Sequence, residues 1–314
     1  MNVDHLKQRA EIVQRIRSFF LARDVLEVTT PCVVPHAVSD VHIESISLNT
    51  TPPAFLRTSP ESAHKWLLSE GLKSFYELGP VFRGGELGRH HQPEFTLLEW
   101  YRADWSWQAL AEEVLALVST IASAHSHDWP SRWQSWSDAC KEAIGCELTP
   151  DEATQWQRWV PEEIRHWPLE DQIDHVFARH VQSTWPRGEI HVIYDYPIHQ
   201  KALAELTDTG RHAKRFEVFV GPVELANGYQ ELRDLDEQRR RFNDDLARRQ
   251  HRQRPCPAPD ARLLGALEAG LPRCAGVALG VDRLVMLALG LDDINQAATL
   301  SQTHGLSPKP PQVS

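Results

Sequence analysis

The chain has 314 residues, of which 41% are apolar and 24% are charged. This composition is enough for one large or two ordinary globular domains, and it excludes a disordered or fibrous protein. The formal net charge of -10 argues against an enzyme whose whole surface grips nucleic acid, because phosphate binding needs a positive field.

The apolar segments and the cysteines indicate the compartment. The longest apolar run, residues 285–291, is far too short to cross a bilayer, and the first residues lack an apolar secretory core. Five cysteines form no CxxC pair, which is typical of reduced thiols. We therefore expect a cytoplasmic protein without a membrane segment or a structural zinc site.

Hydrophobic spacing predicts helices and short strands in the first part of the chain. Apolar residues recur every three or four positions from residue 5 to residue 24, as in an amphipathic helix. Two later β-rich runs flank a polar loop over 83–93, which predicts a hairpin. In chain order we expect a helix over 5–24, strands over 25–28 and 55–58, a helix over 59–70, strands over 74–82 and 94–101, and a helix over 110–121.

The character of the sequence then changes. Seven of the eleven tryptophans lie between Trp129 and Trp185, among many charges and few aliphatic residues. We interpret residues 126–188 as a helical insertion in one domain over 1–296, because they hold too few aliphatic residues for an independent core. Residues 297–314 are expected to form a flexible tail.

The last third of the chain predicts a second group of elements. We expect a strand over 191–195, a hairpin over 216–232, a charged helix from residue 234, a helix over 261–269, and a strand over 275–279 that enters a helix over 281–289. Antiparallel hairpins with helices grouped around them indicate an α+β fold.

Three segments could carry chemistry. The loop over 83–93 holds two arginines and two histidines around glycines, a composition that suits a phosphate-bearing substrate. Taken alone, the loop is more typical of an ordinary solvated hairpin tip. Glu217, Glu224 and Glu231 recur at seven-residue intervals in an apolar hairpin. Buried carboxylates need cations, so Mg²⁺ with nucleotide phosphates or a substrate ammonium group would satisfy them, unless the strand faces are solvated.

The third segment is GVALGVDRL, residues 276–284, a glycine-punctuated strand entering a helix. Arg283 lies in the first helical turn, where a cation is unfavourable unless an anion such as phosphate is near. Separately, residues 233–254 contain eight arginines and five acids. This run predicts either a solvated helix or a docking surface for an acidic macromolecule.

Together these segments resemble the three ordered motifs of class II aminoacyl-tRNA synthetases, in the lysyl subgroup. Motif 1 corresponds to the first helix plus VLEVTTP ending at Pro31, motif 2 to FRGGELGRHHQPEFTLLEWY, and motif 3 to GVALGVDRL. The resemblance runs from about residue 5 to residue 296. It implies a catalytic core with an antiparallel β-sheet flanked by helices, use of ATP and Mg²⁺, and a homodimer formed through the motif 1 region.

One branch of that family fits the length best. Lysyl-tRNA synthetases carry an OB-type anticodon-binding domain before motif 1, whereas this sequence starts almost at motif 1, so tRNA is an unlikely partner. The chain is similar to the truncated ligases that attach (R)-β-lysine to a lysine of elongation factor P. Ala278 stands where synthetases usually have glycine, and Ser59 where they often have alanine. Both residues favour this branch as a preference only, because one methyl group changes the discrimination of a pocket by about 1–3 kcal/mol.

Two other functions stay open. The first is a stand-alone lysyl-tRNA synthetase-like enzyme that activates α-lysine for a tRNA or another acceptor. The second is an inactive paralogue that serves as a binding subunit. Retention of the motif arginines and of the three glutamates argues against the inactive paralogue.

The resemblance also implies residue roles. Arg83 would hold the α-phosphate and Arg283 the γ-phosphate. Further ATP contacts are implied for Gly84, Gly85, Glu86, His91, Gln92, Phe95, Glu224, Leu225 and Gly280, and Mg²⁺ ligation for Glu217 and Glu224. Substrate contacts are implied for Ser59, Pro60, Glu61, Glu99, Tyr101, Asn227, Glu231 and Ala278. Gly85 departs from the family pattern, which has an ATP-binding glutamate there, and Gln92 replaces an asparagine.

Overall fold

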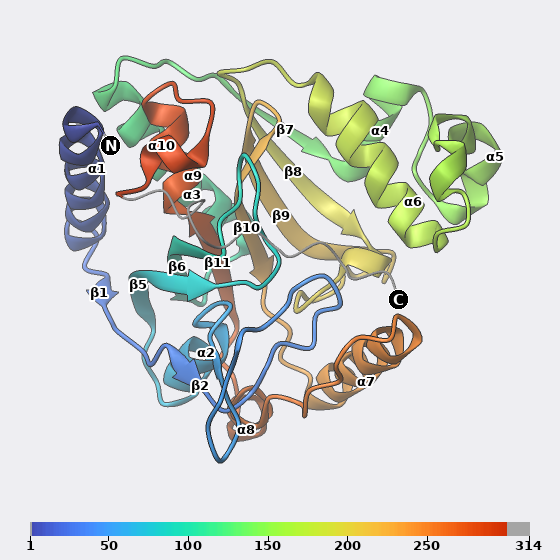
Figure 1. Cartoon of the computed structure of the whole chain (residues 1–314), viewed down its shortest axis with the longest axis horizontal. Coiled ribbons are helices and arrows are strands. Elements are labelled where there is room, and N and C mark those ends of the chain that lie inside the picture. The colour runs from blue at the N-terminus through green and yellow to red at the C-terminus, as the bar shows by residue number, and fades with distance from the viewer. Residues whose placement is uncertain (1, 300–314) are drawn as a thin grey trace. The chain divides into compact units, whose positions relative to one another are not determined.

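The computed structural model describes residues 2–299 (Figure 1). Its residue contacts divide them into two compact units. The first unit holds the described residues up to 104, residues 233–274 and the described residues from 278 onward. The second unit holds Trp105–Leu232 and Ala275–Val277. Each unit is described by itself.

The first unit is built on the predicted hairpin (Figure 1). Strands β5 (Ser74–Phe82) and β6 (Glu94–Ala103) pair antiparallel, with Ser74 opposite Arg102 and Phe82 opposite Glu94. The two-residue strand β1 (Leu26–Glu27) pairs parallel with β5. A separate small sheet has the order β2 (Val33–Val34), β4 (Ala54–Leu56), β3 (Ser47–Leu48). Of these three strands only β4 was predicted, because two-residue strands leave no alternation to read.

Helices of the first unit bury one face each. In α1 the buried residues include Ile12, Ile16 and Phe20, at helical spacing, and Phe20 stacks on Tyr76 of β5 with ring centroids 4.3 Å apart. Helix α2 packs against α8 over a buried cluster that includes Leu68 and Leu267. The helices are α1 (Val3–Leu21), α2 (Glu61–Ser69), α7 (Leu235–His251), α8 (Ala261–Ala269), α9 (Val281–Ala288) and α10 (Ile294–Ala297).

The second unit is built on the glutamate-containing hairpin. Strands β9 (His212–Val220) and β10 (Val223–Gln230) turn at Gly221, whose φ of +55° favours glycine. Within this unit β9 also pairs with β8 (Ile190–Pro197), and β8 pairs in parallel with β7 (Ser131–Ser135). Helix α3 (Trp107–Ala124) packs on β9 and β10. Strand β11 (Cys274–Gly280) contributes Ala275–Val277 to this unit.

The tryptophan-rich segment is helical except at β7, where the prediction of helix is wrong. Trp136, Trp156 and Trp185 line a buried core with residues of β8 and β9, and Trp136 stacks on Phe177 with centroids 3.6 Å apart. Strand β7 escaped prediction because its partner β8 follows more than fifty residues later. The segment holds α4 (Trp136–Ile144), α5 (Ala153–Trp156), α6 (Leu169–Val176), 3₁₀ turns at Pro150–Glu152, Gln157–Trp159, Glu162–Ile164 and Gln182–Thr184, and a π turn at Phe177–Val181; another 3₁₀ turn, Ile198–Gln200, follows β8.

The remaining helix and strand predictions are confirmed to within a few residues, and α8 has the predicted bounds. Among residues 2–299 no helix is both long and apolar enough to cross a membrane. The predicted tail over 297–314 lies outside the described residues from residue 300 onward.

Candidate active site

The motif 2 arginine lies at the end of strand β5. The guanidinium of Arg83 is 5.2 Å from the ring centroid of Phe95, and its Nη1 is 3.8 Å from Oε1 of Glu86. Its Nε is buried and makes no hydrogen bond within the described chain. A buried donor without a partner is costly, so this atom fits an anionic ligand.

Backbone conformation explains why Gly85 departs from the family pattern. Gly85 has a φ of +73°, a left-handed conformation that a glutamate would adopt only with strain. The preceding Gly84 donates its N–H to the carbonyl of Glu44 at 2.8 Å, and a Cβ on Gly84 would meet the Glu44 side chain at 3.2 Å. Glu86, one position later, is the carboxylate that approaches Arg83.

The structure brings motif 2 and motif 3 together inside the first unit. Arg283 Nε donates to the carbonyl of His90 at 3.2 Å, and its Nη2 lies 2.8 Å from His91 Nε2. Burial lowers the pKa of His90, and the positive charges of Arg283 and Arg89 lower it further. Gly280 precedes α9, and a Cβ there would lie 3.6 Å from the Arg283 side chain. The loop tip therefore carries a concentrated positive charge.

The far end of the loop is fixed to α10 and to the residues just before it. Gln92 Nε2 donates to Asn295 Oδ1 at 2.6 Å, and Arg89 Nε donates to the carbonyl of Asp292 at 2.6 Å. The predicted ATP contact of Gln92 is thus a side chain that already orients the loop. Sequence reasoning gave Asn295 no role.

Asp282, next to Arg283, has a structural role that sequence reasoning missed. Its Oδ1 lies 2.6 Å from Arg9 Nη1 of α1, and its Oδ2 accepts the backbone N–H of Thr96 at 2.6 Å. Arg9 also donates to Thr96 Oγ1 at 2.9 Å. These contacts tie α1, β6 and α9 together beside the motif 3 arginine.

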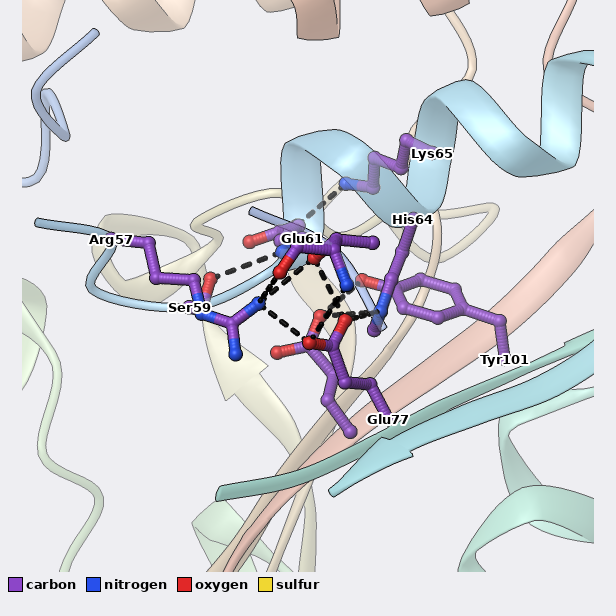
Figure 2. A network of polar contacts seen from close by, with 9 residues as sticks. Arg57, Ser59, Glu61, His64, Lys65, Glu77 and Tyr101 are labelled. Atoms are coloured by element: carbon purple, nitrogen blue, oxygen red, sulfur yellow. Dashed lines mark hydrogen bonds and ion pairs between the residues drawn. The ribbon is translucent and has the colours of Figure 1, made fainter. Parts of the chain in front are cut away.

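Helix α2 begins at the predicted substrate residues (Figure 2). Ser59 Oγ accepts the backbone N–H of Glu61 at 3.3 Å, and Pro60 is the N-cap. Glu61 Oε1 accepts from Nζ of Lys65, which is 1% exposed, at 2.7 Å. Burial raises the pKa of Glu61, although the ammonium of Lys65 lowers it. Lys65 is a buried cation that the sequence analysis did not assign.

Glu99 and Tyr101, on neighbouring positions of one face of β6, lie in the same network. Tyr101 donates its hydroxyl to Glu99 Oε1 at 3.0 Å, and His64 Nδ1 lies 3.4 Å from that same oxygen. Both Glu99 and Tyr101 are buried. His64, which was not predicted from the sequence, therefore lies next to Glu99 in the predicted amine site.

The network continues away from the predicted substrate residues. His64 Nε2 lies 3.0 Å from Glu77 Oε2, and Arg57 Nη1 donates to Glu77 Oε1 at 2.6 Å (Figure 2). Thr30 donates its N–H and hydroxyl to the same carboxylate. Although burial favours the neutral acid, the hydrogen bonds from His64, Thr30 and Arg57 lower the pKa of Glu77 to about 2. In the sequence, the one sign of this buried network was a glutamate, Glu77, inside the largely apolar strand over 74–82.

In the second unit Glu217 is already paired. The Tyr196 hydroxyl donates to Glu217 Oε2 at 2.7 Å, and the guanidinium of Arg215 donates to Oε1. Burial raises the pKa of Glu217, and Arg215 opposes that rise. Asn227 lies opposite Glu217 in the hairpin; its Oδ1 accepts from Arg215 at 3.2 Å, and its amide donates to Tyr229. Sequence reasoning missed Arg215.

The carboxylates of the second unit could bind a metal ion only together with oxygen atoms of a bound substrate. Among residues 2–299 no group of three or more His, Cys, Asp or Glu side chains is arranged to hold a metal ion. Glu217 retains lone pairs beyond its two bonds, and Glu224 is half-buried on β10. Mg²⁺ often binds through one or two carboxylates plus substrate phosphates, so the pair fits that mode rather than a protein-built cage.

The other predicted residues lie on strands. Leu225 is buried in β10, Glu231 is 1% exposed just beyond it, and Ala278 is half-buried in β11. Glu231 forms an isolated bridge with Ala204.

The arginine-rich helix α7, predicted to be either a solvated helix or a docking surface, buries two of its arginines. Arg241 and Arg249 are each 4% exposed; Arg241 donates to Glu237, and Arg249 donates to the carbonyl of Asp40. Arg239 and Arg240 remain exposed, with side chains 51% and 72% accessible. A docking surface on α7 can therefore use these two but not Arg241.

The chain is similar to known proteins over nearly its whole length. A family model described as tRNA synthetases class II (D, K and N) matches residues 2–304. A relative from Avibacterium paragallinarum called elongation factor P–(R)-beta-lysine ligase is 38% identical over 316 residues, covering 96% of each chain. Relatives of the same name from Vibrio cholerae and Salmonella gallinarum are 36% and 37% identical, covering 94% and 93% of each chain.

Proposed function

Because this chain belongs to the class II tRNA synthetases of the D, K and N type, we propose that it activates (R)-β-lysine with ATP and transfers it to a lysine of elongation factor P. The observation that carries the proposal is 38% identity over 96% of both chains with a relative of that name. The family implies use of ATP.

The first step forms an adenylate. A carboxylate oxygen of the amino acid attacks the α-phosphorus of ATP, the bond to the β-phosphate oxygen breaks, and pyrophosphate leaves. The protein contributes position and charge rather than a covalent bond. Arg83 supports this role through its buried Nε, which an α-phosphate oxygen would satisfy. Arg283 would meet the γ-phosphate, with His91 and Phe95 beside the adenine.

The second step transfers the amino acid. The ε-amine of the acceptor lysine attacks the adenylate carbonyl carbon, the bond to the phosphate oxygen breaks, and AMP leaves as the amine releases a proton. Glu61, Glu99 and Tyr101 are proposed to bind a substrate amine in the first unit. Asn227 and Glu231 have the same proposed role in the second unit.

Magnesium is proposed to accompany ATP. Glu217 and Glu224 would hold it together with phosphate oxygens, and it would neutralise charge on the phosphates. The existing pair between Arg215 and Glu217 supplies a competing cation at that carboxylate. Arg215→Met should therefore tighten Mg²⁺ binding, measured by the Mg²⁺ concentration that half-saturates ATP binding; unchanged half-saturation would contradict Glu217 as a ligand.

Amino-acid-dependent exchange between ATP and pyrophosphate tests the activation step. We expect exchange with (R)-β-lysine well above exchange with α-lysine. Preference for α-lysine together with charging of tRNA would favour the synthetase-like alternative, and exchange with neither would refute both enzymatic functions. Ala278→Gly is the matched pocket variant, and it should shift the preference toward α-lysine by roughly fivefold to a hundredfold, which corresponds to about 1–3 kcal/mol.

Docking of the protein acceptor is proposed to use α7. Arg239→Glu with Arg240→Glu should lower transfer to elongation factor P and leave pyrophosphate exchange intact, because only the macromolecular step needs a docking charge. The exposed pair Arg158→Glu with Arg165→Glu makes the same charge change elsewhere and should alter neither step. Equal loss of both steps in the α7 variant would contradict a docking role.

A homodimer through the motif 1 region is also proposed. Leu21 and Leu26 in motif 1, and Val33 just after it, are 80%, 54% and 54% exposed, which leaves apolar side chains that a partner subunit could cover. Leu21→Glu should shift the mass measured by light scattering from dimer to monomer. A wild-type protein that is monomeric at micromolar concentration would contradict the proposal.

A further inference from the structure

His64 stands at the centre of a buried chain of charged groups in the first unit. The ring is 0% exposed on helix α2, between Glu77 of β5 and Glu99 of β6. Phe75 and Tyr101 pack edge-on against it, with ring centroids 5.2 and 5.5 Å away. In Figure 2 a dashed line joins the His64 ring to the Glu77 carboxylate.

The partners of the ring determine its protonation state. Nε2 lies 3.0 Å from Glu77 Oε2, and Nδ1 lies 3.4 Å from Glu99 Oε1. An ionised carboxylate only accepts hydrogen bonds, and a neutral imidazole has only one N–H to donate. Nε2 is within hydrogen-bond distance of Glu77, whereas Nδ1 makes no hydrogen bond and faces Glu99 as an ion-pair partner, so a charge on the ring suits both carboxylates. Burial opposes the charged ring, but the adjacent carboxylates of Glu77 and Glu99 raise the pKa of His64.

The charges of the network balance when the ring is charged. Arg57 bonds Glu77 at 2.6 Å, and Lys65 bonds Glu61 at 2.7 Å. Each of these carboxylates thus has its own cation, which leaves Glu99 with His64. Glu99 is 3% exposed, and an ionised carboxylate buried to that extent is costly without a partner.

The geometry also leaves one Glu99 oxygen for a ligand. The Tyr101 hydroxyl and His64 Nδ1 both approach Oε1. Oε2, the other acceptor, can receive a donor-only cation such as an ammonium group without displacing either neighbour.

We infer that His64 is a positioning residue for the substrate amine: held as an imidazolium between Glu77 and Glu99, it pairs with the Glu99 carboxylate through Oε1 and leaves the second oxygen of that carboxylate for the amine. The inference rests on the proposed function, in which Glu99 binds that amine. Arg57 and Thr30 act one step further out, because they fix the Glu77 carboxylate that holds the ring.

A spectroscopic measurement on the free protein tests the charged ring without any substrate. With ¹⁵N-labelled histidine at neutral pH, the signals that vanish in His64→Gln should show protons on both ring nitrogens. In Glu77→Gln the amide can donate to Nε2, so the same signals should become those of a neutral ring. A neutral ring in the wild-type protein would overturn the inference.

Kinetics test the positioning. His64→Gln should raise the KM for (R)-β-lysine in pyrophosphate exchange by about tenfold to a hundredfold, the range for losing a hydrogen bond to a charged group. The KM for ATP should change by less than about twofold if only the amine contact is lost. Glu77→Gln, which keeps the ring, should raise the same KM by a smaller factor.

A matched control separates this role from general packing. His191→Gln removes another buried histidine, 2% exposed on β8 in the second unit, and should leave the KM for (R)-β-lysine unchanged. If His64→Gln and Glu77→Gln change both KM values equally, or neither, the positioning role is refuted. Absence of wild-type exchange with either lysine isomer would instead refute the proposed function, while the ring signals still decide its charge.

Discussion

Asp282→Asn should destabilise the protein while leaving the neighbouring motif 3 arginine in place. The carboxylate is 10% exposed and lies 2.6 Å from Arg9, whose side chain is 15% exposed. It also accepts the backbone N–H of Thr96 at 2.6 Å. The substitution keeps the size of the side chain and an oxygen for Thr96, and it removes the charge that Arg9 needs.

The size of the effect follows from the burial of this pair. Removing one partner of a buried ion pair costs about 3–5 kcal/mol, because the other charge is left uncompensated. An amide retains one hydrogen bond and the pair is not fully buried, so we expect a cost at or just below the lower limit of that range, about 2–3 kcal/mol. Arg9→Met removes the opposite charge, and the double variant should recover part of the loss.

Urea unfolding of the four proteins gives the coupling between Asp282 and Arg9. We expect a coupling of about 1.5–3 kcal/mol from the double-mutant cycle. The exposed pair of Arg17 and Glu27, with side chains 48% and 37% accessible and also involving α1, is the matched control and should couple by less than about 1 kcal/mol.

A coupling for Asp282 and Arg9 no larger than that of the control pair would refute the reasoning. It would mean that solvent screens this pair as it screens a surface pair, and that Thr96 alone explains the conformation of Asp282.

Three further predictions concern the same unit. Arg283→Ala should abolish adenylate formation but move the urea midpoint little, because its contacts are polar contacts with the motif 2 loop; unchanged exchange would refute the phosphate role. Because the folded pKa of Glu77 is about 2 against 4.5, its stabilisation is complete above pH 4.5 and is lost as pH falls toward 2, up to about 3 kcal/mol at 1.36 kcal/mol per unit. Glu77→Gln should flatten that part of the stability profile; an unaltered acid slope would contradict it. Gly85→Ala should cost about 1–2 kcal/mol through its left-handed backbone, whereas Gly88→Ala, which has open space, should cost less than half of that; equal losses would show that the φ of Gly85 is not limiting.

Local patterns predicted most of the fold. The spacing of apolar residues, together with turn residues such as Gly71 and Gly221, was enough to predict both hairpins and helices α1, α2, α3, α8 and α9. The strands that were not predicted are those whose pairing leaves no local pattern in the sequence. Strand β7 depends on β8 far along the chain, and β2 and β3 have two residues each.

The sequence singles out Arg83, Arg283 and Glu217 as candidate site residues because these charged residues stand in glycine-rich or apolar surroundings. It does not identify the cations that pair with the buried glutamates, since Arg57, Arg215 and Lys65 look like ordinary surface residues until the fold buries them. His64 is the clearest example: nothing within α2 shows that strands β5 and β6 place a carboxylate on each side of its ring.

Apparent exposure in sequence misled in the same way. The sequence of α7 predicts a solvated helix or a docking surface, yet helical periodicity turns Arg241 and Arg249 inward, where each donates to an oxygen acceptor. Only the outward positions are available to a protein partner.

The most direct test of the proposed function is the mass of elongation factor P after incubation with the enzyme, ATP and (R)-β-lysine. We expect one lysyl increment on a single lysine, dependent on ATP and absent with Arg283→Ala. An unmodified factor in the presence of robust (R)-β-lysine-dependent pyrophosphate exchange would contradict transfer to this acceptor.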